Sequence, residues 1–379
     1  MSIASGVGKG QKHYGAVEPK YGLVIKVHGA SSEVWMRRFF LLDVFASAPF
    51  HPRDGEGKKL PKRFRLMNPR LLCKDLEARN GHFSSTTTGE TIRDSGNIAF
   101  ASSGAFSRKQ FQRAMQHFKH LYGPDVNVTV IDLRKEFHWI GDGEPFSQHT
   151  FTNHQNMHLS LDELIAQEKE FIKTHSEGVT VWARRIDEDI TPVLRRYSTI
   201  QTEEDLVLSE KHTSYVRMPL TDHTALDLKT TKRLYRIIKE TVVAAQRKDA
   251  APHVVWFHCL GGQGRASGLT FAAHVIARRE LSRPENPIPL ATFEALAKHI
   301  WYGGGKDLSA DPNPDKRYKY NGAICRRGCL QALVEAAHDS KSANPLIDRI
   351  CIKIQEYCER HRELWEHQVD PSDFAEALE

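Results

Sequence analysis

A glycine-rich stretch at residues 258–267, which reads HCLGGQGRAS, constrains the fold of this chain more than any other feature. The apolar run VVWF at 254–257 precedes it, and residues 269–276 follow with the composition of a helix. A buried strand, a tight turn and a helix in this order are typical of α/β folds whose helix N-terminus binds an anion. The three glycines allow backbone angles closed to other residues and let successive N–H groups converge. The stretch therefore predicts an α/β protein with a phosphate or oxyanion site at this turn.

The same turn contains a nucleophile and a guanidinium at a fixed spacing. Cys259 is followed by five residues and then by Arg265. A helix N-terminus and a nearby guanidinium both favour the thiolate form of a cysteine, and an arginine fork grips two phosphate oxygens. We expect Cys259 to attack a phosphorus atom and to form a phosphocysteine that water then hydrolyses. A buried cysteine in a glycine-rich turn is the alternative, but the strand–turn–helix context favours phosphate chemistry.

This chemistry also needs a group that protonates the leaving alcohol and later accepts a proton from water. Asp222 is the best candidate, because it follows an apolar strand at 215–218 and lies in a loop before a long helix. We expect His223, beside it, to contact a phosphate. The alternative for Asp222 is a turn or helix-capping aspartate, which is a common use of the residue.

The composition is that of a globular protein, with 40% hydrophobic and 26% charged residues. The six cysteines among 379 residues are too few for a disulfide framework. No stretch reaches the length of a transmembrane helix, and residues 1–15 lack the apolar core of a signal peptide. We therefore expect no membrane partner and a place in the cytoplasm, or delivery by a specialised secretion system, whose signals are often disordered.

The formal net charge is +6, and the basic residues are clustered. The clusters lie at 58–59, 62–65, 184–185, 195–196, 316–319 and 326–327. Each one alone is typical of a solvated face. Together with a phosphate site they favour a densely phosphorylated small molecule as substrate. Nucleic acid is the other polyanion, but no aromatic platform or recognition helix supports it, and we expect no nucleic-acid partner.

The remaining pattern predicts alternating strands and helices. The strand at 126–133 ends in the charged residues DLRKEFH, where open α/β sheets bind ligands. Ser107 is predicted to cap a helix over 108–121. Residues 139–158 and 303–322, rich in glycine and polar side chains, are predicted to be loops.

Several separated motifs resemble, in order, those of the protein-tyrosine-phosphatase-like inositol polyphosphatases, the cysteine phytases of bacteria. The motifs are HCxxGxGR at 258–265, Phe64-Arg65, SSGAFSRKQ at 102–110, the segment from Asp132 to Pro145, Gln201-Thr202-Glu203, and Thr221-Asp222-His223. The resemblance runs from about residue 60 to about residue 335. It implies the activity of a phosphatase on myo-inositol hexakisphosphate (phytate), without a metal or an organic cofactor.

The resemblance also implies a fold and a division of the chain. The expected fold is α/β, a cysteine-phosphatase core with a central, mostly parallel sheet flanked by helices. Residues 1–50 would be a partly disordered extension and 51–340 the tyrosine-phosphatase-like catalytic domain. A small β-rich unit would be inserted at about 140–200, and 341–379 would form a C-terminal helical segment.

By the same resemblance the catalytic residues are Cys259, Arg265 and Asp222. Arg65, Asp132 and His223 are expected to bind substrate. The phosphate-binding loop contributes His258, Leu260, Gly261, Gly262, Gln263, Gly264 and Ala266. Basic side chains from other segments are expected to bind further phosphates, namely Arg184, Arg185, Lys306, Lys316 and Lys319.

The chain departs from the family pattern after the loop arginine, where Ala266 replaces the usual hydroxyl residue and Ser267 follows. Leu260 stands where an acidic residue is common, and the acid loop lacks a proline. A protein tyrosine or phosphoinositide phosphatase and a phosphate-binding protein with weak turnover therefore stay open as alternatives. By the resemblance the protein resides in the bacterial cytoplasm or is injected into a host cell as a type III effector. The oligomeric state and the phosphate removed first stay open.

Overall fold

The structure is a computed structural model that describes residues 60–67, 97–149, 154, 156–185, 193–282, 288–302, 306, 308, 317–339 and 344–366, together with the strand at 39–42. For a few strand and helix residues, among them 39–42, 182–185 and 317–319, only the backbone is described.

Five strands form the central sheet, in the order β10-β4-β11-β3-β2. They are β2 (Arg65–Met67), β3 (Ile98–Ser103), β4 (Asn127–Arg134), β10 (Thr213–Leu220) and β11 (His253–His258). β10, β4, β11 and β3 run parallel, and the edge strand β2 runs antiparallel to β3. The predicted mostly parallel sheet is confirmed.

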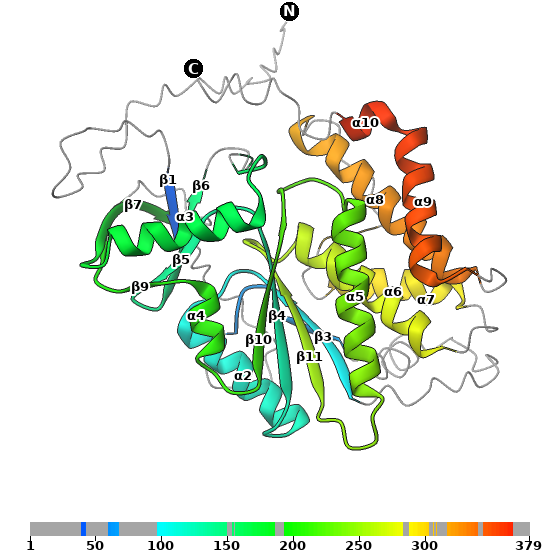
Figure 1. The fold of residues 1–379 in the computed structure, drawn as a ribbon, viewed down its shortest axis with the longest axis horizontal. Coiled ribbons are helices and arrows are strands. Elements are labelled where there is room, and N and C mark those ends of the chain that lie inside the picture. The colour runs from blue at the N-terminus through cyan, green and yellow to red at the C-terminus, as the bar shows by residue number, and fades with distance from the viewer. Residues whose placement is uncertain are drawn as a thin grey trace, which may run out of the picture.

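Helices cover both faces of this sheet (Figure 1). One face packs on α2 (Arg108–Tyr122) and α4 (Glu203–Leu208). The other packs on α5 (Leu228–Ala245) and α6 (Gly264–Leu281). On these two helices pack α7 (Leu290–Tyr302), α8 (Arg317–His338) and α9 (Leu346–Arg360), which the short α10 (Arg362–Glu366) follows. Along β11 the side chains alternate between the two cores, as a strand buried on both faces requires. Val255 and Phe257 join the α5–α6 side, and Val254 and Trp256 join the α2 side.

A second sheet has the order β8-β7-β1-β6-β5-β9. Its strands are β1 (Phe39–Leu42), β5 (His138–Gly141), β6 (Glu144–His149), β7 (Val179–Arg185), β8 (Val193–Tyr197) and β9 (Ile200–Gln201). Helix α3 (Leu161–Thr174) packs on it through a small aromatic core that includes Trp139, Phe146 and Leu164. β1 pairs with β6 and β7, so four residues of the expected N-terminal extension take part in this sheet.

The prediction of a loop over 139–158 is wrong for its first half. β5 and β6 form an antiparallel hairpin joined by Asp142 and Gly143, whose φ angles are 50° and 84°. Positive φ at both central residues is the signature of a type I′ turn, for which Asp-Gly is a preferred sequence. The aspartate also accepts hydrogen bonds from the backbone N–H groups of Ser198 and Thr199, which fixes the turn against β9.

The predicted loop over 303–322 is wrong at its end, because α8 already begins at Arg317. The capping prediction is confirmed: Ser107 and Gln110 form a reciprocal capping box at the start of α2. Within the described residues no helix combines the length and apolar character that a membrane span needs.

The parallel pairing brings the carboxyl ends of four strands to one edge of the sheet. β11 lies between β4 and β3, so His258 pairs in register with both Asp132 and Ser103. The segments that leave β4, β10 and β11 carry the charged and nucleophilic residues that the sequence singled out. This edge is where open α/β sheets bind ligands.

Candidate active site

The phosphate loop, residues 258–266, leaves β11 and runs into α6, which begins at Gly264. Gly262 has a φ of +70°, and a Cβ atom there would lie 2.4 Å from the backbone nitrogen of Gly104. Only glycine fits this position, because both the backbone angle and the close approach exclude a side chain. Cys259 lies at the base of the loop and is 3% exposed.

Three consecutive carbonyl groups of the phosphate loop point away from its centre. Each accepts a hydrogen bond from outside the loop: Leu260 O from Ala105 N at 3.1 Å, Gly261 O from Arg63 Nη1 at 2.6 Å, and Gly262 O from Arg65 Nη2 at 2.9 Å. In a planar trans peptide the N–H points opposite to the C=O. The N–H groups of residues 261–263 are therefore turned toward the inner side of the loop, as an anion site at a helix N-terminus requires.

Arg265 lies at the end of the phosphate loop, in the first turn of α6, and is 3% exposed. Its Nη1 and Nη2 donate to the two carboxylate oxygens of Glu136 at 2.8 and 2.7 Å. Nη1 also donates to the carbonyl of Leu220 at 3.1 Å. Such a two-point pair fixes the plane of the guanidinium. Glu136 belongs to the motif after β4, but nothing in that motif indicates a pair with the loop arginine.

The Glu136 carboxylate and the Arg265 guanidinium sustain each other's charge. Burial opposes ionisation of Glu136, but Arg265 lowers the pKa of this carboxyl below its usual value of 4.5. Burial would lower the pKa of Arg265, yet Asp222 and Glu136 hold it well above its usual value. A carboxyl whose pKa is lowered on folding contributes stability above its unfolded pKa, and that contribution is lost as the pH falls through the folded pKa.

We expect Glu136→Gln to lower kcat/KM by about 10- to 100-fold, because a misplaced binding group of this kind costs up to about that factor. It should also lower the free energy of unfolding by about 3 kcal/mol at neutral pH, since breaking a buried pair leaves a charge uncompensated. The loss should shrink in acid, as wild-type Glu136 becomes protonated. Steady-state kinetics and urea denaturation at several pH values test this. The exposed Glu240→Gln on α5 is the control, and an effect of equal size there would contradict the assignment.

Asp222 lies in the acid loop, residues 221–227, between β10 and α5. Its Oδ1 is 3.3 Å from Nε of Arg265, and its side chain is 18% exposed. His223 follows with a φ of 63°, and its Nε2 lies 3.6 Å from Asp222 Oδ2. The structure thus brings Asp222 and His223 to the arginine of the phosphate loop, across a long gap in sequence.

Four arginines lie close enough to Cys259 for its charge to act on their pKa values, namely Arg63, Arg65, Arg265 and Arg326. Burial is the larger effect on Arg63, Arg65 and Arg326 and lowers their pKa values, that of Arg65 to about 10. The sequence analysis included Arg63 and Arg326 only as members of basic clusters, because neither belongs to the motif around Cys259.

Arg65 is 2% exposed, and its guanidinium donates to the outward carbonyl of Gly262 and to Ser267 Oγ at 3.3 Å. These contacts support the outer wall of the loop, and the contact of Arg65 with substrate stays a prediction. Arg63, which is only half-buried, is the more accessible cation of this pair.

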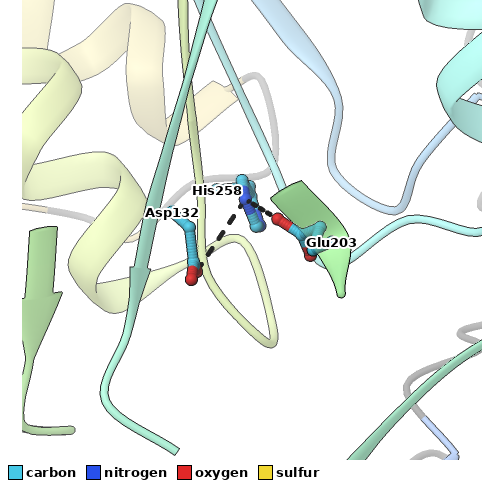
Figure 2. A group of neighbouring side chains, drawn as sticks. All are labelled: Asp132, Glu203 and His258. Carbon is cyan, nitrogen blue, oxygen red and sulfur yellow. Dashed lines mark ion pairs between the residues drawn. The ribbon is translucent and has the colours of Figure 1, made fainter. Parts of the chain in front are cut away.

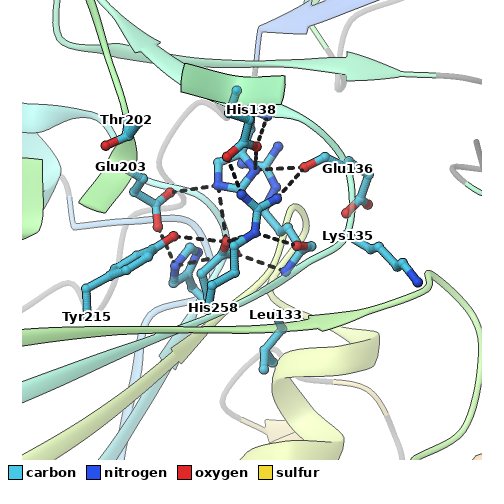
Figure 3. A network of polar contacts seen from close by, with 12 residues as sticks. Leu133, Lys135, Glu136, His138, Thr202, Glu203, Tyr215 and His258 are labelled. Atoms are coloured by element: carbon cyan, nitrogen blue, oxygen red, sulfur yellow. Dashed lines mark hydrogen bonds and ion pairs between the residues drawn. The ribbon is translucent and has the colours of Figure 1, made fainter. Parts of the chain in front are cut away.

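Asp132 and His258 are both 0% exposed, so neither faces the inner side of the phosphate loop as predicted. They lie beneath the phosphate loop in a buried polar network (Figures 2 and 3). Its contacts are Asp132 Oδ2 with His138 Nε2 at 3.2 Å, with Arg217 Nε at 3.4 Å and with the Tyr215 hydroxyl at 3.1 Å, and His258 Nε2 with Glu203 Oε1 at 2.7 Å. Arg217 also pairs with Glu168 of α3. The network therefore connects the base of the phosphate loop to the second sheet and to α3.

Asp132, Glu203 and His258 offer donor atoms within 4.8 Å of one another, a spacing compatible with a metal ion (Figure 2). The surroundings do not favour a cation. Burial would raise the pKa of Asp132, but His138, Arg217 and His258 hold it well below its usual range. Because these groups already balance the Asp132 carboxylate, we assign Asp132, Glu203 and His258 to the buried, ion-paired support of the phosphate loop.

The other predicted substrate residues lie in or beside the phosphate loop, on β7, on α8, or outside the described residues. Leu260 is 8% exposed, and Ala266 is 0% exposed at the start of α6. The Lys306 backbone N–H donates to Ser267 Oγ at 3.1 Å, and its side chain is exposed beside the loop. Arg184 and Arg185 lie on β7 and are described by their backbone alone, as is Lys319 on α8. Lys316 lies outside the described residues.

Two cavities lie away from the phosphate loop. One of about 450 Å³ opens where the strands begin, beside Asn127 and His253. The other, of about 210 Å³, adjoins the buried network at Glu203 and Arg217. The first is at the wrong end of the sheet for a ligand site of this fold class.

The chain is similar in sequence to one family of known proteins and in fold to several solved structures. Residues 131–277 match the family model of the PTP-like phytases, whose description reads inositol hexakisphosphate. No curated protein sequence matches the chain. The tandemly repeated protein tyrosine phosphatase like phytase from Mitsuokella multacida is 19% identical with a TM-score of 0.57, over 90% of this chain and 49% of that one.

Two further structures are similar. The PTP-like myo-inositol phosphatase from Mitsuokella multacida, in complex with myo-inositol-(1,3,4,5)-tetrakisphosphate, is 19% identical with a TM-score of 0.57, over 87% of this chain and 49% of that one. A PTP-like phytase from Bdellovibrio bacteriovorus is 18% identical with a TM-score of 0.51, over 83% of this chain and 95% of that one. The chain spans about half the length of the Mitsuokella chains. The resemblance to the PTP-like inositol phosphatases is thus confirmed, in sequence over residues 131–277 and in fold over most of the chain.

Proposed function

We propose that this chain hydrolyses phosphate monoesters of myo-inositol hexakisphosphate through a phosphocysteine on Cys259. The observation that carries the proposal is the phosphate loop itself. Its N–H groups at 261–263 face inward, and Arg265 is held in one orientation by Glu136. Fixed donors aimed at a developing negative charge are the largest single source of catalysis in such sites.

The reaction follows in two steps. In the first, the Cys259 thiolate attacks phosphorus, an S–P bond forms, and the P–O bond to the inositol breaks while Asp222 gives its proton to the leaving oxygen. In the second, the Asp222 carboxylate takes a proton from water as the water oxygen attacks phosphorus. The S–P bond then breaks, which releases inorganic phosphate and restores the thiolate.

The charges around the site support a polyphosphorylated ring as substrate. Arg63 is half-buried and lies close enough to Cys259 for the cysteine's charge to affect its pKa. His223 lies beside Asp222, and the exposed side chain of Lys306 lies beside the loop. A ring that carries several phosphates gains from many cations around one site, whereas phosphotyrosine needs an aromatic slot.

Hydrolysis of phytate and of a phosphotyrosine peptide, compared under the same conditions, tests the proposal. We expect several equivalents of phosphate from each phytate molecule and a kcat/KM for the peptide that is at least about 10-fold lower, which corresponds to about 1.4 kcal/mol. A clear preference for the peptide, or for a phosphoinositide, would show that the substrate assignment is wrong. Arg63→Gln should reduce the phytate rate more than the rate with a small aryl phosphate.

A phosphate-binding protein with weak turnover is the second candidate, and Ala266 favours it. Ala266 offers no hydroxyl to the sulfur, and Ser267 Oγ instead accepts hydrogen bonds from Lys306 N and Arg65. Without that hydroxyl, hydrolysis of the phosphocysteine is expected to be the slow step. Steady phosphate release far beyond one equivalent per chain would eliminate this candidate, and a single burst that stops at one equivalent would establish it.

A further inference from the structure

The acid loop is held by a residue that the motifs did not indicate. His154, between β6 and α3, is 1% exposed, and its Nε2 lies 3.0 Å from the backbone carbonyl oxygen of Asp222. A carbonyl oxygen only accepts hydrogen bonds, so Nε2 carries the hydrogen and donates it. The contact joins the side of the molecule that carries the second sheet directly to the peptide of the proposed general acid.

The other end of the acid loop is held by α8. Arg326 donates from Nε and Nη2 to the carbonyl of Thr224, at 3.2 and 3.1 Å. One turn earlier, the backbone of Gly322 contacts the loop so closely that a Cβ atom there would lie 1.8 Å from the carbonyl oxygen of His223. Three successive residues of the acid loop are therefore contacted from outside it.

The acid loop packs closely on its inner side. A cavity of only about 10 Å³ lies between Thr224, Arg265 and Arg326, room for about one water-sized probe. Within the loop, Thr224 Oγ1 donates to Thr221 O at 2.9 Å, and the left-handed His223 donates its N–H to Asp222 Oδ1 at 3.1 Å. Packing and hydrogen bonds together fix the direction of the Asp222 carboxylate, toward Arg265.

We propose that His154 is a positioning residue for the general acid, and that His154 and Arg326 together hold the acid loop in its working position. The inference rests on the proposed function, in which Asp222 protonates the leaving oxygen. His154 does not touch the substrate. It acts through the Asp222 peptide, and Arg326 acts in the same way through Thr224.

This role predicts a dependence on the leaving group that a general loss of structure does not produce. A monoester of a weakly acidic alcohol needs its leaving oxygen protonated, whereas a dinitrophenyl ester departs as a stable anion and does not. A displaced Asp222 therefore slows formation of the phosphocysteine from the first kind of substrate and leaves its formation from the second nearly unaffected. Loss of fold, or of the phosphate loop, slows both equally.

The experiment measures kcat/KM, which reports the steps up to formation of the phosphocysteine, for phenyl phosphate and for 2,4-dinitrophenyl phosphate in the full chain. We expect His154→Phe, which keeps a ring but removes the donor, to lower kcat/KM for phenyl phosphate by about 10- to 100-fold. The kcat/KM for the dinitrophenyl ester should change less than about twofold. His154→Gln restores an N–H donor and should recover much of the loss. The exposed His158→Phe serves as the matched control and should behave as wild type.

Equal losses with both esters, or no loss with either, would overturn the role of His154. If His154→Phe does not fold, Arg326→Lys makes the same test at the other end of the loop, because lysine keeps the charge and loses the fork. Asp222→Asn must itself show the leaving-group dependence, and if it does not, the proposed acid has failed rather than its support. In the Asp222→Asn background His154→Phe should add no further loss, since groups that act as one unit are not additive.

Discussion

Replacing Cys259 by serine is expected to abolish phosphate release from phytate, with kcat lower by about 10⁴-fold or more. Losing the nucleophile of a concerted catalytic unit costs that order of magnitude or more in enzymes with covalent intermediates. Serine has nearly the shape of cysteine, but its hydroxyl is not ionised near neutral pH. The inward N–H groups at 261–263 and the Arg265–Glu136 pair do not depend on the sulfur. The variant should therefore still bind substrate.

Two measurements on Cys259→Ser separate chemistry from folding. The phosphate assay gives the rate, and calorimetric binding of phytate to the variant shows whether the site is intact. The control is Cys325→Ser, which changes another buried cysteine, on α8. This variant should keep the activity within a few fold of wild type. If Cys259→Ser kept a tenth of the wild-type rate, the covalent route would be excluded.

Asp222→Asn is expected to lower kcat for phytate by about 10²- to 10⁴-fold, which is the usual contribution of a positioned general acid. Asparagine keeps the side-chain size, but it has no proton to give to the leaving inositol oxygen. Removing this carboxylate also removes one of the charges that raise the pKa of Arg265. Glu136 remains to keep the guanidinium charged and oriented.

The pH profile identifies the cause of that loss. The wild-type profile should fall on its alkaline side as the acid loses its proton, and this side should become flat in Asp222→Asn. The exposed Asp249→Asn, at the opposite end of the central sheet, should keep the wild-type profile. A profile that keeps its alkaline side in Asp222→Asn would assign the acid role to another group.

The motif around Cys259 was readable in the sequence because it is local. Spacing, glycines and a strand–helix context all lie within about twenty residues, and the fold class follows from the same alternation of strands and helices. The hairpin at 138–149 was also readable in principle, since Asp142-Gly143 is a type I′ signal. It was missed because the histidines and amides around it look like a loop.

The supports of the site were not readable, because they join residues far apart in sequence. The pairs Glu136–Arg265, His154–Asp222 and Arg326–Thr224 each span dozens of residues or more. A resemblance between motifs also transfers residue types without the direction of their side chains. Arg65 and Asp132 were expected at the substrate, and both are buried against the outside or the base of the phosphate loop.

The proposed mechanism requires a covalent bond between phosphorus and the Cys259 sulfur. An acid-quenched reaction of the full chain with phytate, analysed by peptide mass spectrometry, tests this bond directly. We predict one phosphate on the peptide that contains Cys259, present within the first turnover and absent from Cys259→Ser. Phosphate on another residue, or turnover without any phosphorylated peptide, would contradict the account.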